Sequence, residues 1–423
     1  MTENWFGLVL DVELGAPGHG GFCVARHEGR VVFVRHGLPG ERVMAKVTED
    51  RGGSFCRADA IEILTASPDR IDARCPISGP GGSGCCDYSH ATPQAGRRLK
   101  SSVVAEQLRR VAGIERDVPV EELPGTGDGT GWRTRVRLAV DSGGRPGYHR
   151  YRSSSIVTEL SCPQMDPVAF DGLSDREWRA GAELQVVLDG MGERHVVEVA
   201  PAQLTRTGRR SPGRRGASER RAASSRTRPE KAVIGSGRVT EFVSARPWTL
   251  DATGFWQAHK GAAQVYTDVV RDWADAEPGD GAWDLYGGVG VFAAALAERV
   301  GSSGRVTSVE FSRRAAEDGR SALHDLAQVS FAPGRVERSM DSLPESVAVA
   351  VLDPPRAGAG RDVIEGLATR SPRTIVHIGC DPASFARDAS LYRAAGYELT
   401  DVRAFDAFPL TSHVECIGRF VRK

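Results

Sequence analysis

The chain has 423 residues, 40% hydrophobic and 26% charged, with 55 basic and 55 acidic side chains. We expect two or three domains from this length, and a net charge of zero excludes a uniformly basic protein that coats nucleic acid. The first residues lack the basic start and apolar core of a signal peptide, and no apolar run approaches the roughly 18 residues of a membrane span. We therefore expect a cytoplasmic protein with no membrane partner. Its eight cysteines would stay reduced, for metal binding or catalysis rather than disulfides.

Residues 6–64 alternate apolar and polar residues in short runs that are broken by glycines. The stretches "FGLVLDVELG" and "GGFCVARHEGRVVFVRHGLPGERV" are typical. Strands of about four to seven residues, joined by Gly and Pro-Gly turns, predict a small β-barrel. Cys23 and Cys56 fall on these strands and are interpreted as core packing.

A glycine-rich cysteine cluster, "CPISGPGGSGCCDYSH", follows the barrel, and a helix is predicted across residues 93–113. Residues 131–205 are again β-rich, with "WRTRVRLAVD" and "HVVEVA" as the clearest strands. The next segment, residues 206–231, has ten Arg or Lys, two acids and no large apolar residue. Such a composition cannot form a core and predicts a mobile loop. Two interpretations stay open: a solvated insertion, or an arm that contacts RNA phosphates.

From about residue 250 the pattern changes to strand–turn–helix repeats, such as "GAWDLYGGVGVFAAALAERVG" and "TIVHIGCDPASFARDASLYRAAG". This alternation predicts an α/β region with a doubly wound parallel sheet. In the first repeat a strand ends at Asp284, and Gly287, Gly288 and Gly290 let the backbone turn tightly against a ligand. Glu310 follows twenty residues later at the end of the next strand, where a carboxylate can accept hydrogen bonds from both ribose hydroxyls.

Two cofactors compete for this turn, a dinucleotide and S-adenosylmethionine. The spacing differs from G-x-G-x-x-G, and the chain offers no substrate domain for hydride transfer. A helix amino terminus without a phosphate suits the methionyl carboxylate equally well, so the methyl donor is favoured.

Three further groups are predicted at the same edge of the sheet. "LDPPRAG" ends a strand at Asp353, and Arg356 stands where amine-directed methyltransferases carry a stacking aromatic. Cys380 ends the next strand; a small buried hydrophobe is its alternative interpretation. His413 and Glu415 open the final strand close to that edge.

A thiolate and a carboxylate beside a methyl donor define a specific chemistry. Carbon 5 of uracil is a poor nucleophile, but a thiolate added to C6 makes C5 a carbanion that can take a methyl group. A base must then remove the C5 proton so that the thiolate can leave. Methylation of nitrogen or oxygen needs neither group.

The chain resembles the uracil-5 RNA methyltransferases, which make 5-methyluridine in 23S ribosomal or transfer RNA. Residues 6–64 resemble the RNA-binding TRAM barrel of that family, and "GFWQAH", "DLYGGVG", "LDPPRAG", "GCDPASFARD" and "FPLTSHVE" resemble its other motifs. The resemblance implies Cys380 as nucleophile and Glu415 as proton acceptor. It also implies an S-adenosylmethionine site that contains Gln257, Tyr286, Gly288, Glu310 and Asp353. The family pattern often has Cys at Gly287 and Asn at His259, and we expect both departures to be tolerated.

The resemblance also implies a domain division. Residues 1–67 would form the TRAM-like, OB-like barrel, and residues 68–92 with 116–245 a β-rich central RNA-binding domain. Residues 93–115 with 246–423 would form the Rossmann-like methyltransferase domain. The expected partner is RNA, with ribosomal favoured over transfer RNA, and the expected state is a monomer. The alternatives are a non-catalytic RNA-binding factor and a methyltransferase with another target, such as a resistance-related one.

Many family members hold a [4Fe–4S] cluster through Cys-x5-Cys-x2-Cys and a distant fourth cysteine. The corresponding residues here are Cys75, Cys85, Cys86 and Cys162. If Cys86 matches the third ligand, Ser83 occupies the second ligand's position, and Cys85 must substitute from an adjacent site. Four thiols remain, the number that a cluster needs. Reduced structural cysteines are the alternative.

Overall fold

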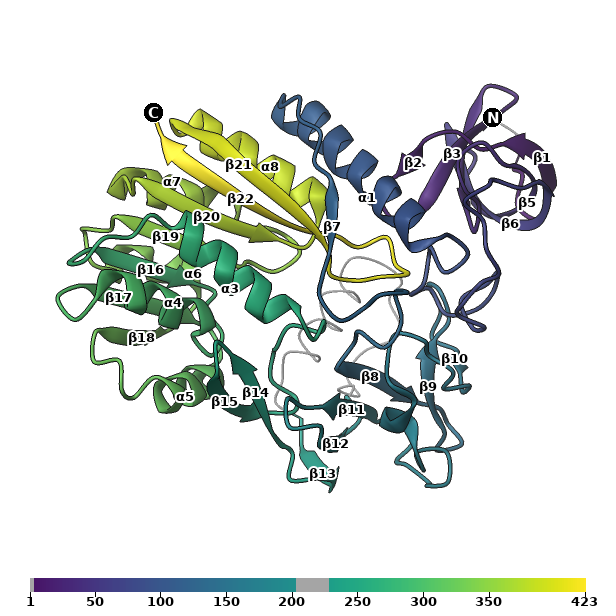
Figure 1. Cartoon of the computed structure of the whole chain (residues 1–423). Coiled ribbons are helices and arrows are strands. Elements are labelled where there is room, and N and C mark those ends of the chain that lie inside the picture. The colour runs from purple at the N-terminus through teal and green to yellow at the C-terminus, as the bar shows by residue number, and fades with distance from the viewer. Residues whose placement is uncertain (1–3, 203–227) are drawn as a thin grey trace, which may run out of the picture.

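The computed structural model describes residues 4–202 and 228–423, whose strands form four sheets (Figure 1). Most of the Arg-rich segment 206–231 lies outside the described residues. Among the described residues, none of the helices combines the length and apolar character needed to cross a bilayer.

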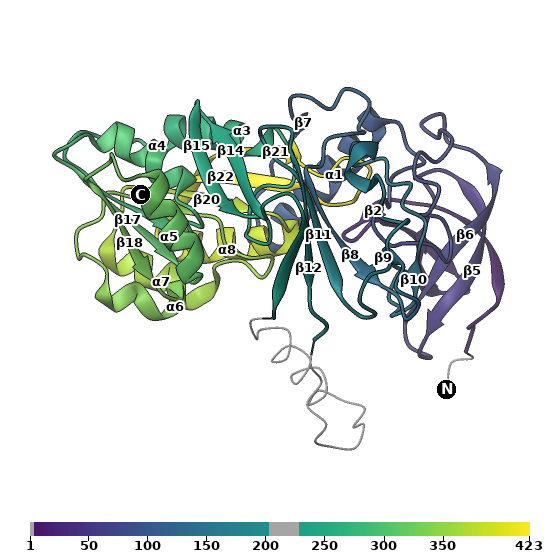
Figure 2. The same cartoon turned by 90° about the horizontal axis from the view of Figure 1, so that it is seen from below.

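The first sheet is the predicted N-terminal barrel, seen at one end of the molecule in Figure 2. Its strand order is β1-β5-β6-β4-β3-β2. The strands are β1 (Val9–Glu13), β2 (Pro17–Gly18), β3 (Phe22–His27), β4 (Arg30–Arg35), β5 (Arg42–Asp50) and β6 (Phe55–Thr65). Alternate side chains, among them Val32 and Val43, fill a separate hydrophobic core. Strands β5 and β6 have nine and eleven residues, longer than predicted, because bulges let them bend without ending.

The second sheet is antiparallel, in the order β10-β9-β8-β11-β12-β13. Its strands are β8 (Arg135–Val140), β9 (Pro146–His149), β10 (Ile156–Val157), β11 (Glu183–Leu188), β12 (Arg194–Val199) and β13 (Glu230–Ile234), with a 3₁₀ helix at Pro167–Phe170. A hairpin of β14 (Arg238–Val243) and β15 (Arg246–Asp251) then leads to the last sheet. Ser244 and Ala245 both have positive φ, as a tight two-residue hairpin turn requires.

The predicted helix at 93–113 is present as α1 (Pro93–Gln107), continued by a π-helical turn at Leu108–Ala112. Thr92 caps its start by accepting a hydrogen bond from the Ala95 N–H, and Gly113 ends it in the left-handed conformation. The short strand β7 (Val120–Glu122) follows and pairs with β21 (Tyr397–Asp406) at the edge of the last sheet. This N-terminal segment therefore packs onto the C-terminal half of the chain.

The eight-stranded sheet has the order β18-β17-β16-β19-β20-β22-β21-β7. Its other strands are β16 (Gly281–Leu285), β17 (Arg305–Glu310), β18 (Val329–Pro333), β19 (Val349–Leu352), β20 (Thr374–Gly379) and β22 (Glu415–Arg422). Strands β16 to β20 run parallel, and β22 pairs antiparallel with β20. The order reverses at β16, which is where such sheets bind ligands.

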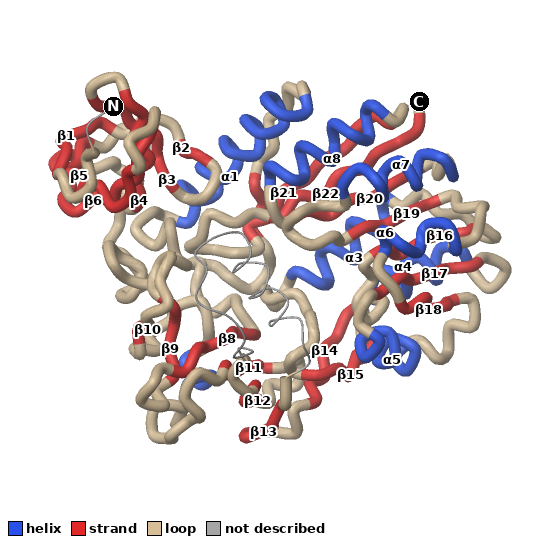
Figure 3. Tube along the Cα trace, turned by 180° about the vertical axis from the view of Figure 1, so that it is seen from behind, coloured by secondary structure: helices blue, strands red, loops and turns tan. Residues whose placement is uncertain are grey.

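Helices cover both faces of this sheet (Figure 3). They are α3 (Ala262–Trp273), α4 (Val291–Val300), α5 (Arg313–Ala322), α6 (Val336–Ser339) with a 3₁₀ turn at Met340–Ser342, α7 (Gly360–Arg370) and α8 (Pro382–Ala394). One hydrophobic cluster joins α3 and α4 to one face, and another joins α1, α7 and α8 to the opposite face. All residues of β19 and β20 are consequently buried, as in a sheet covered on both sides. The predicted α/β, doubly wound fold class is confirmed.

Candidate active site

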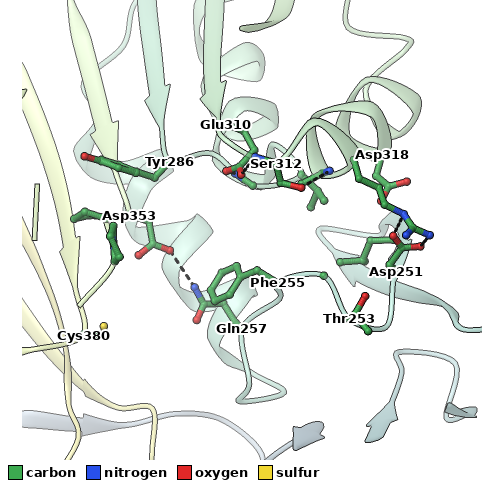
Figure 4. A pocket seen from close by; sticks show the side chains of 18 of the residues that line it. Asp251, Thr253, Phe255, Gln257, Tyr286, Glu310, Ser312, Asp318, Asp353 and Cys380 are labelled. Carbon is green, nitrogen blue, oxygen red and sulfur yellow. Dashed lines mark hydrogen bonds and ion pairs between the residues drawn. The ribbon is translucent and has the colours of Figure 1, made fainter. Parts of the chain in front are cut away.

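A cavity of about 740 Å³ lies at the carboxyl ends of β16, β17, β19 and β20 (Figure 4). It extends from Cys380 and Asp353 at one end, past Glu310, to Asp251 at the other. The seven residues predicted for catalysis and cofactor binding all line it: Cys380, Glu415, Gln257, Tyr286, Gly288, Glu310 and Asp353. The fold brings them together because the parallel strands present their carboxyl ends at one edge.

The glycine-rich turn after β16 holds the Glu310 carboxylate. Gly288 has a φ of +56°, which glycine adopts without a steric penalty, and its N–H donates to Glu310 Oε2 at 3.0 Å. The Ser312 N–H donates to Glu310 Oε1 at 2.6 Å. These two bonds from neighbouring turns fix the carboxylate at the cavity wall, where its remaining lone pairs can accept ribose hydroxyls.

Tyr286 and Gly287 shape the same turn. Tyr286 has a φ of +62°, a left-handed conformation that is uncommon for an aromatic residue. Its hydroxyl donates to Glu337 at 3.1 Å, while the residue lines the cavity. A Cβ on Gly287 would lie 2.2 Å from Ser308 Oγ, so this chain has no room for a cysteine there unless Ser308 moves. The departure at Gly287 thus has a packing reason.

Asp353 and Gln257 meet across 96 residues of sequence, with Gln257 Nε2 donating to Asp353 Oδ2 at 3.2 Å. Burial raises the pKa of the Asp353 carboxyl to about 7, and the Gln257 hydrogen bond opposes this rise. Asp353 is half-buried at the cavity wall, and a carboxyl with a pKa near neutrality responds to any charge that enters the cavity.

Cys380 follows β20 and directly precedes the N-cap of α8, Asp381. Burial raises the pKa of the Cys380 thiol to about 12, and the nearby Glu415 and Asp353 carboxyls add to the rise. The Arg356 cation opposes it. The position at a helix amino terminus likewise favours a thiolate. The raised pKa keeps Cys380 a thiol at rest, with the carboxyls of Glu415 and Asp353 and the Arg356 cation nearby.

Glu415 is buried at the start of β22, and burial followed by repulsion from Asp353 raises its pKa well above the usual range. No donor in the described part of the chain hydrogen bonds its Oε1 atom. His413, by contrast, does not belong to the cavity wall, and its ring packs against Phe408. Burial lowers the pKa of His413 to about 4. Of the two candidate bases, Glu415 is the one at the cavity.

The loop before Glu415 is anchored by residues that the motifs do not include. The ammonium of the buried Lys100, on α1, pairs with Asp406 and donates to the Phe408 carbonyl at 3.0 Å. Ser412 donates to the buried Asp87 at 2.9 Å. The loop is therefore clamped at both ends by side chains from the segment between the barrel and the second sheet.

Comparisons with known proteins identify the family of the chain. Residues 7–60 match the TRAM domain model, and residues 300–423 match the model of tRNA (uracil-5-)-methyltransferases. An uncharacterized RNA methyltransferase of Corynebacterium efficiens is 41% identical over 99% of this chain and 96% of its own length. The 23S rRNA (uracil(1939)-C(5))-methyltransferase RlmD of Alkalilimnicola ehrlichii is 30% identical over 98% and 97%. The chain belongs to the RNA uracil-C5 methyltransferase family.

One solved structure shares the fold of the present chain over nearly the whole length of the chain. It is the Pyrococcus abyssi tRNA (uracil-54, C5)-methyltransferase in complex with S-adenosyl-L-homocysteine, with a TM-score of 0.70. The two chains are 18% identical, and the match covers 97% of this chain and 100% of the other. As a uracil-C5 methyltransferase, the present enzyme uses S-adenosylmethionine as its methyl donor.

The methyltransferase cavity also contains residues that the motifs did not indicate. Ser312 caps α5 two residues after Glu310, and a Ser at that distance from a strand-end acid is a recognisable N-cap signal. Asp251 ends β15 and pairs with Arg238 at 2.8 Å and with Arg314. These contacts depend on tertiary neighbours. The remaining wall residues outside the motifs are Glu230, Leu250, Thr253, Ala315 and Asp318.

The four cysteines predicted as metal ligands lie together in a second buried site. The Sγ atoms of Cys85 and Cys86 are 3.9 Å apart, and Cys75 hydrogen bonds with Cys86. Cys162 is buried close enough to feel the charges of Cys75 and Cys85. Ser83 Oγ lies 3.3 Å from Cys85 Sγ, so the Cys85 sulfur is beside the residue at the second ligand's position. The adjacent cysteines therefore both face this site.

Cys86 hydrogen bonds with both Cys75 and Cys85, and these contacts change the pKa values of the three thiols. Hydrogen bonding with Cys86 lowers the pKa of Cys85 to about 6 against the effect of burial, and the same contact lowers that of Cys75. The pKa of Cys86 is correspondingly raised. Gln164 Nε2 contacts Cys86 Sγ at 3.1 Å. Burial raises the pKa of Cys162, so only two of the four thiols are made more acidic. The gathering of four sulfurs in one place is what fits a metal group, whose binding displaces the remaining protons.

Proposed function

We propose that the enzyme methylates C5 of a uridine in ribosomal RNA, with Cys380 as nucleophile and Glu415 as base. The observation that supports this most directly is the position of both side chains on one buried cavity, beside Asp353. A nitrogen- or oxygen-directed methyltransferase needs no thiol there. The same observation counts against a non-catalytic RNA-binding factor.

The cofactor end of the cavity is assigned to the predicted residues. Glu310, held by two backbone N–H groups, accepts the ribose hydroxyls, and Gly288 allows the close approach of the ligand. Gln257 and Asp353 bind the methionine end. When bound, S-adenosylmethionine supplies an electrophilic methyl group.

The uracil end follows from thiol and carboxylate chemistry. The Cys380 thiolate adds to C6, and the electron pair of the C5–C6 bond moves onto C5, which takes the methyl group. Glu415 then accepts the C5 proton, the C5–C6 double bond re-forms, and the C6–S bond breaks. Before addition, the Cys380 thiol and the Glu415 carboxylic acid must each lose a proton to solvent. At the end Cys380 is again a thiolate, and Glu415 carries the C5 proton, which it returns to solvent before the next cycle.

Ribosomal RNA is favoured because the relative named for 23S rRNA is 30% identical over 98% of this chain, whereas the solved tRNA enzyme is 18% identical. Mass-spectrometric mapping of 5-methyluridine in RNA from cells with and without the gene tests this. If 5-methyluridine is lost from 23S rRNA, the proposal is supported. If it is lost from tRNA, the substrate is tRNA instead. No loss from either supports another target.

We further propose a [4Fe–4S] cluster held by Cys75, Cys85, Cys86 and Cys162, with reduced structural cysteines as the alternative. Protein purified without oxygen should be brown and contain about four irons. Cys162→Ser should lose iron and stability, because a metal site links distant segments. Cys23→Ser, in the barrel core, is the matched control that keeps iron. Iron-free wild-type protein of full stability contradicts the proposal.

We propose the same domain roles that the sequence implied. Residues 1–67 and the central part, 68–92 with 116–245, would bind RNA, and 93–115 with 246–423 would carry out methyl transfer. The segment 206–231 adds ten basic side chains that could neutralise phosphates. We propose that the enzyme works as a monomer in the cytoplasm, where its RNA substrate and reduced thiols are found.

A further inference from the structure

The outer face of the barrel carries apolar side chains where the alternation of a half-buried strand would place polar ones. On β3 and β4 the outward residues include Phe22, Val24, Val31 and Phe33, between fully buried inward neighbours. On β6 the outward Phe55 is 46% exposed. Apolar side chains gathered on an outer surface mark an interaction site more often than a structural need.

Phe22, Phe33 and Phe55 form a connected group of rings. Together with the adjoining Arg57 they are here called the aromatic patch. The ring centroids of Phe22 and Phe33 are 5.0 Å apart, and those of Phe33 and Phe55 are 5.5 Å apart. The Arg57 guanidinium lies 5.6 to 5.7 Å from all three centroids. It contacts Glu49 at 3.5 Å, which fixes it at the centre of the patch.

A groove of about 940 Å³ adjoins the aromatic patch, between the barrel and the end of α1. Phe22 and Phe33 line one side, and Gln107 and Arg110 of α1 line the other. His19, in the same groove, pairs with Asp381 at 3.0 Å, and Asp381 directly follows Cys380. The groove therefore leads from the aromatic patch to the segment that carries the nucleophile.

We propose that the aromatic patch and this groove bind unpaired RNA bases that flank the target uridine. Each base has a π-face that can stack on a phenylalanine ring, and arginine adds a cation–π or phosphate contact. Bases within a duplex cannot stack in this way, so the site selects single-stranded RNA. His19 joins the groove to Asp381, next to Cys380, so a strand that passes the aromatic patch continues toward the cavity, and this position favours RNA over a protein partner.

This inference rests on the proposed RNA substrate, and its test is a binding assay that needs no methyl transfer. Fluorescence anisotropy compares an unstructured RNA of about 12 nucleotides with a duplex of the same length. Phe33→Ala should weaken binding of the single strand about tenfold and leave the weaker duplex binding unchanged. Arg57→Ala should act in the same direction, and Phe33→Tyr, which keeps the ring, should restore binding.

Phe6→Ala is the matched control, since Phe6 is 68% exposed on the same barrel but belongs to neither ring pair of the aromatic patch. It should bind both RNAs like the wild type. Because the barrel has its own core, an unchanged circular-dichroism spectrum and an unchanged denaturant midpoint show that each variant is folded. Phe55→Ala, at the more exposed ring, replaces Phe33→Ala if that variant unfolds. Wild-type affinity in the patch variants overturns the inference, as does a loss of self-association in sedimentation, which would make the aromatic patch a contact between two copies.

Methyl transfer is measured separately, so the two proposals can fail independently. If the wild type forms 5-methyluridine in RNA and the patch variants bind RNA normally, only the inference about the aromatic patch falls. If the wild type forms no 5-methyluridine but the patch variants lose single-stranded RNA binding, the binding site is supported and the proposed reaction is refuted.

Discussion

The active-site cavity and the outer face of the barrel each invert the usual arrangement of a folded protein. The cavity wall holds carboxyls that ordinarily face water, with Glu415 buried and Asp353 half-buried, and the barrel exposes rings such as Phe55 that ordinarily face a core. Burial makes protonation states responsive, which chemistry needs, whereas exposure leaves stacking surface free, which recognition needs. Buried ionisable groups therefore indicate catalysis in the cavity, and exposed rings indicate recognition on the barrel.

The largest effect should come from removing the proposed nucleophile. Cys380→Ala leaves no group that can add to C6, so C5 gains no carbanion character, and methyl transfer should fall by about 10⁴-fold or more. Incorporation of labelled methyl groups into RNA measures this. Cys23→Ala, in the barrel core, is the control that should keep activity. Residual methylation of uridine by Cys380→Ala at a rate near the wild type would refute the mechanism.

Glu415→Gln should lower turnover by about 10² to 10⁴-fold, because the amide keeps the shape of the side chain but cannot accept the C5 proton. Methyl transfer could still proceed while release of the product stalls. We expect an RNA-linked protein that survives denaturing gel electrophoresis and forms only with S-adenosylmethionine. A variant that turns over normally would leave Cys380 as nucleophile and move the base elsewhere, with His413 nearest in sequence.

The buried carboxyls predict a pH dependence of cofactor binding. Burial raises the pKa of Asp353 to about 7, so below that pH the group is protonated before binding. S-adenosylmethionine carries a sulfonium cation, which favours the carboxylate and lowers this pKa, so binding releases a proton. Affinity should rise up to about tenfold per pH unit below pH 7 and level off above it.

Titration calorimetry in buffers of different ionisation enthalpy measures that proton release. S-adenosylhomocysteine is the matched control, because it lacks the sulfonium charge and should release fewer protons. The other ionising groups of the cavity wall are the same in both titrations: Cys380, Glu415, Arg356, Tyr286, Glu310, Asp251, Glu230, Asp318 and Arg314. Equal proton release by the two ligands would mean that the cavity carboxyls do not respond to the cofactor's charge.

The smallest effect is expected on the barrel and concerns stability. Phe55→Ala should change the free energy of unfolding by less than about 0.5 kcal/mol, because the ring is 46% exposed on the outer face. Leu14→Ala, at a buried position of the same barrel, should cost about 2 to 5 kcal/mol. Denaturant unfolding compares them. A large cost for Phe55→Ala would mean that the aromatic patch serves the fold.

The sequence by itself determined the fold class, the family and the candidate residues at the strand ends. Gly288, Glu310 and Cys380 stand at the carboxyl ends of predicted strands, and the end of a parallel strand is a position that local pattern reveals. Motifs such as "GCDPASFARD" are continuous in the chain, so no long-range packing had to be known.

Only the tertiary structure decided how these groups behave and what surrounds them. The pKa of Glu415 depends on burial beneath elements far away in sequence, and the Lys100 clamp on its loop joins residues about 300 positions apart. The aromatic patch depends on the pairing of β4 with β6, which sets Val31 opposite Phe55. Strand pairing and burial are properties of the whole packed chain, and a local pattern does not contain them.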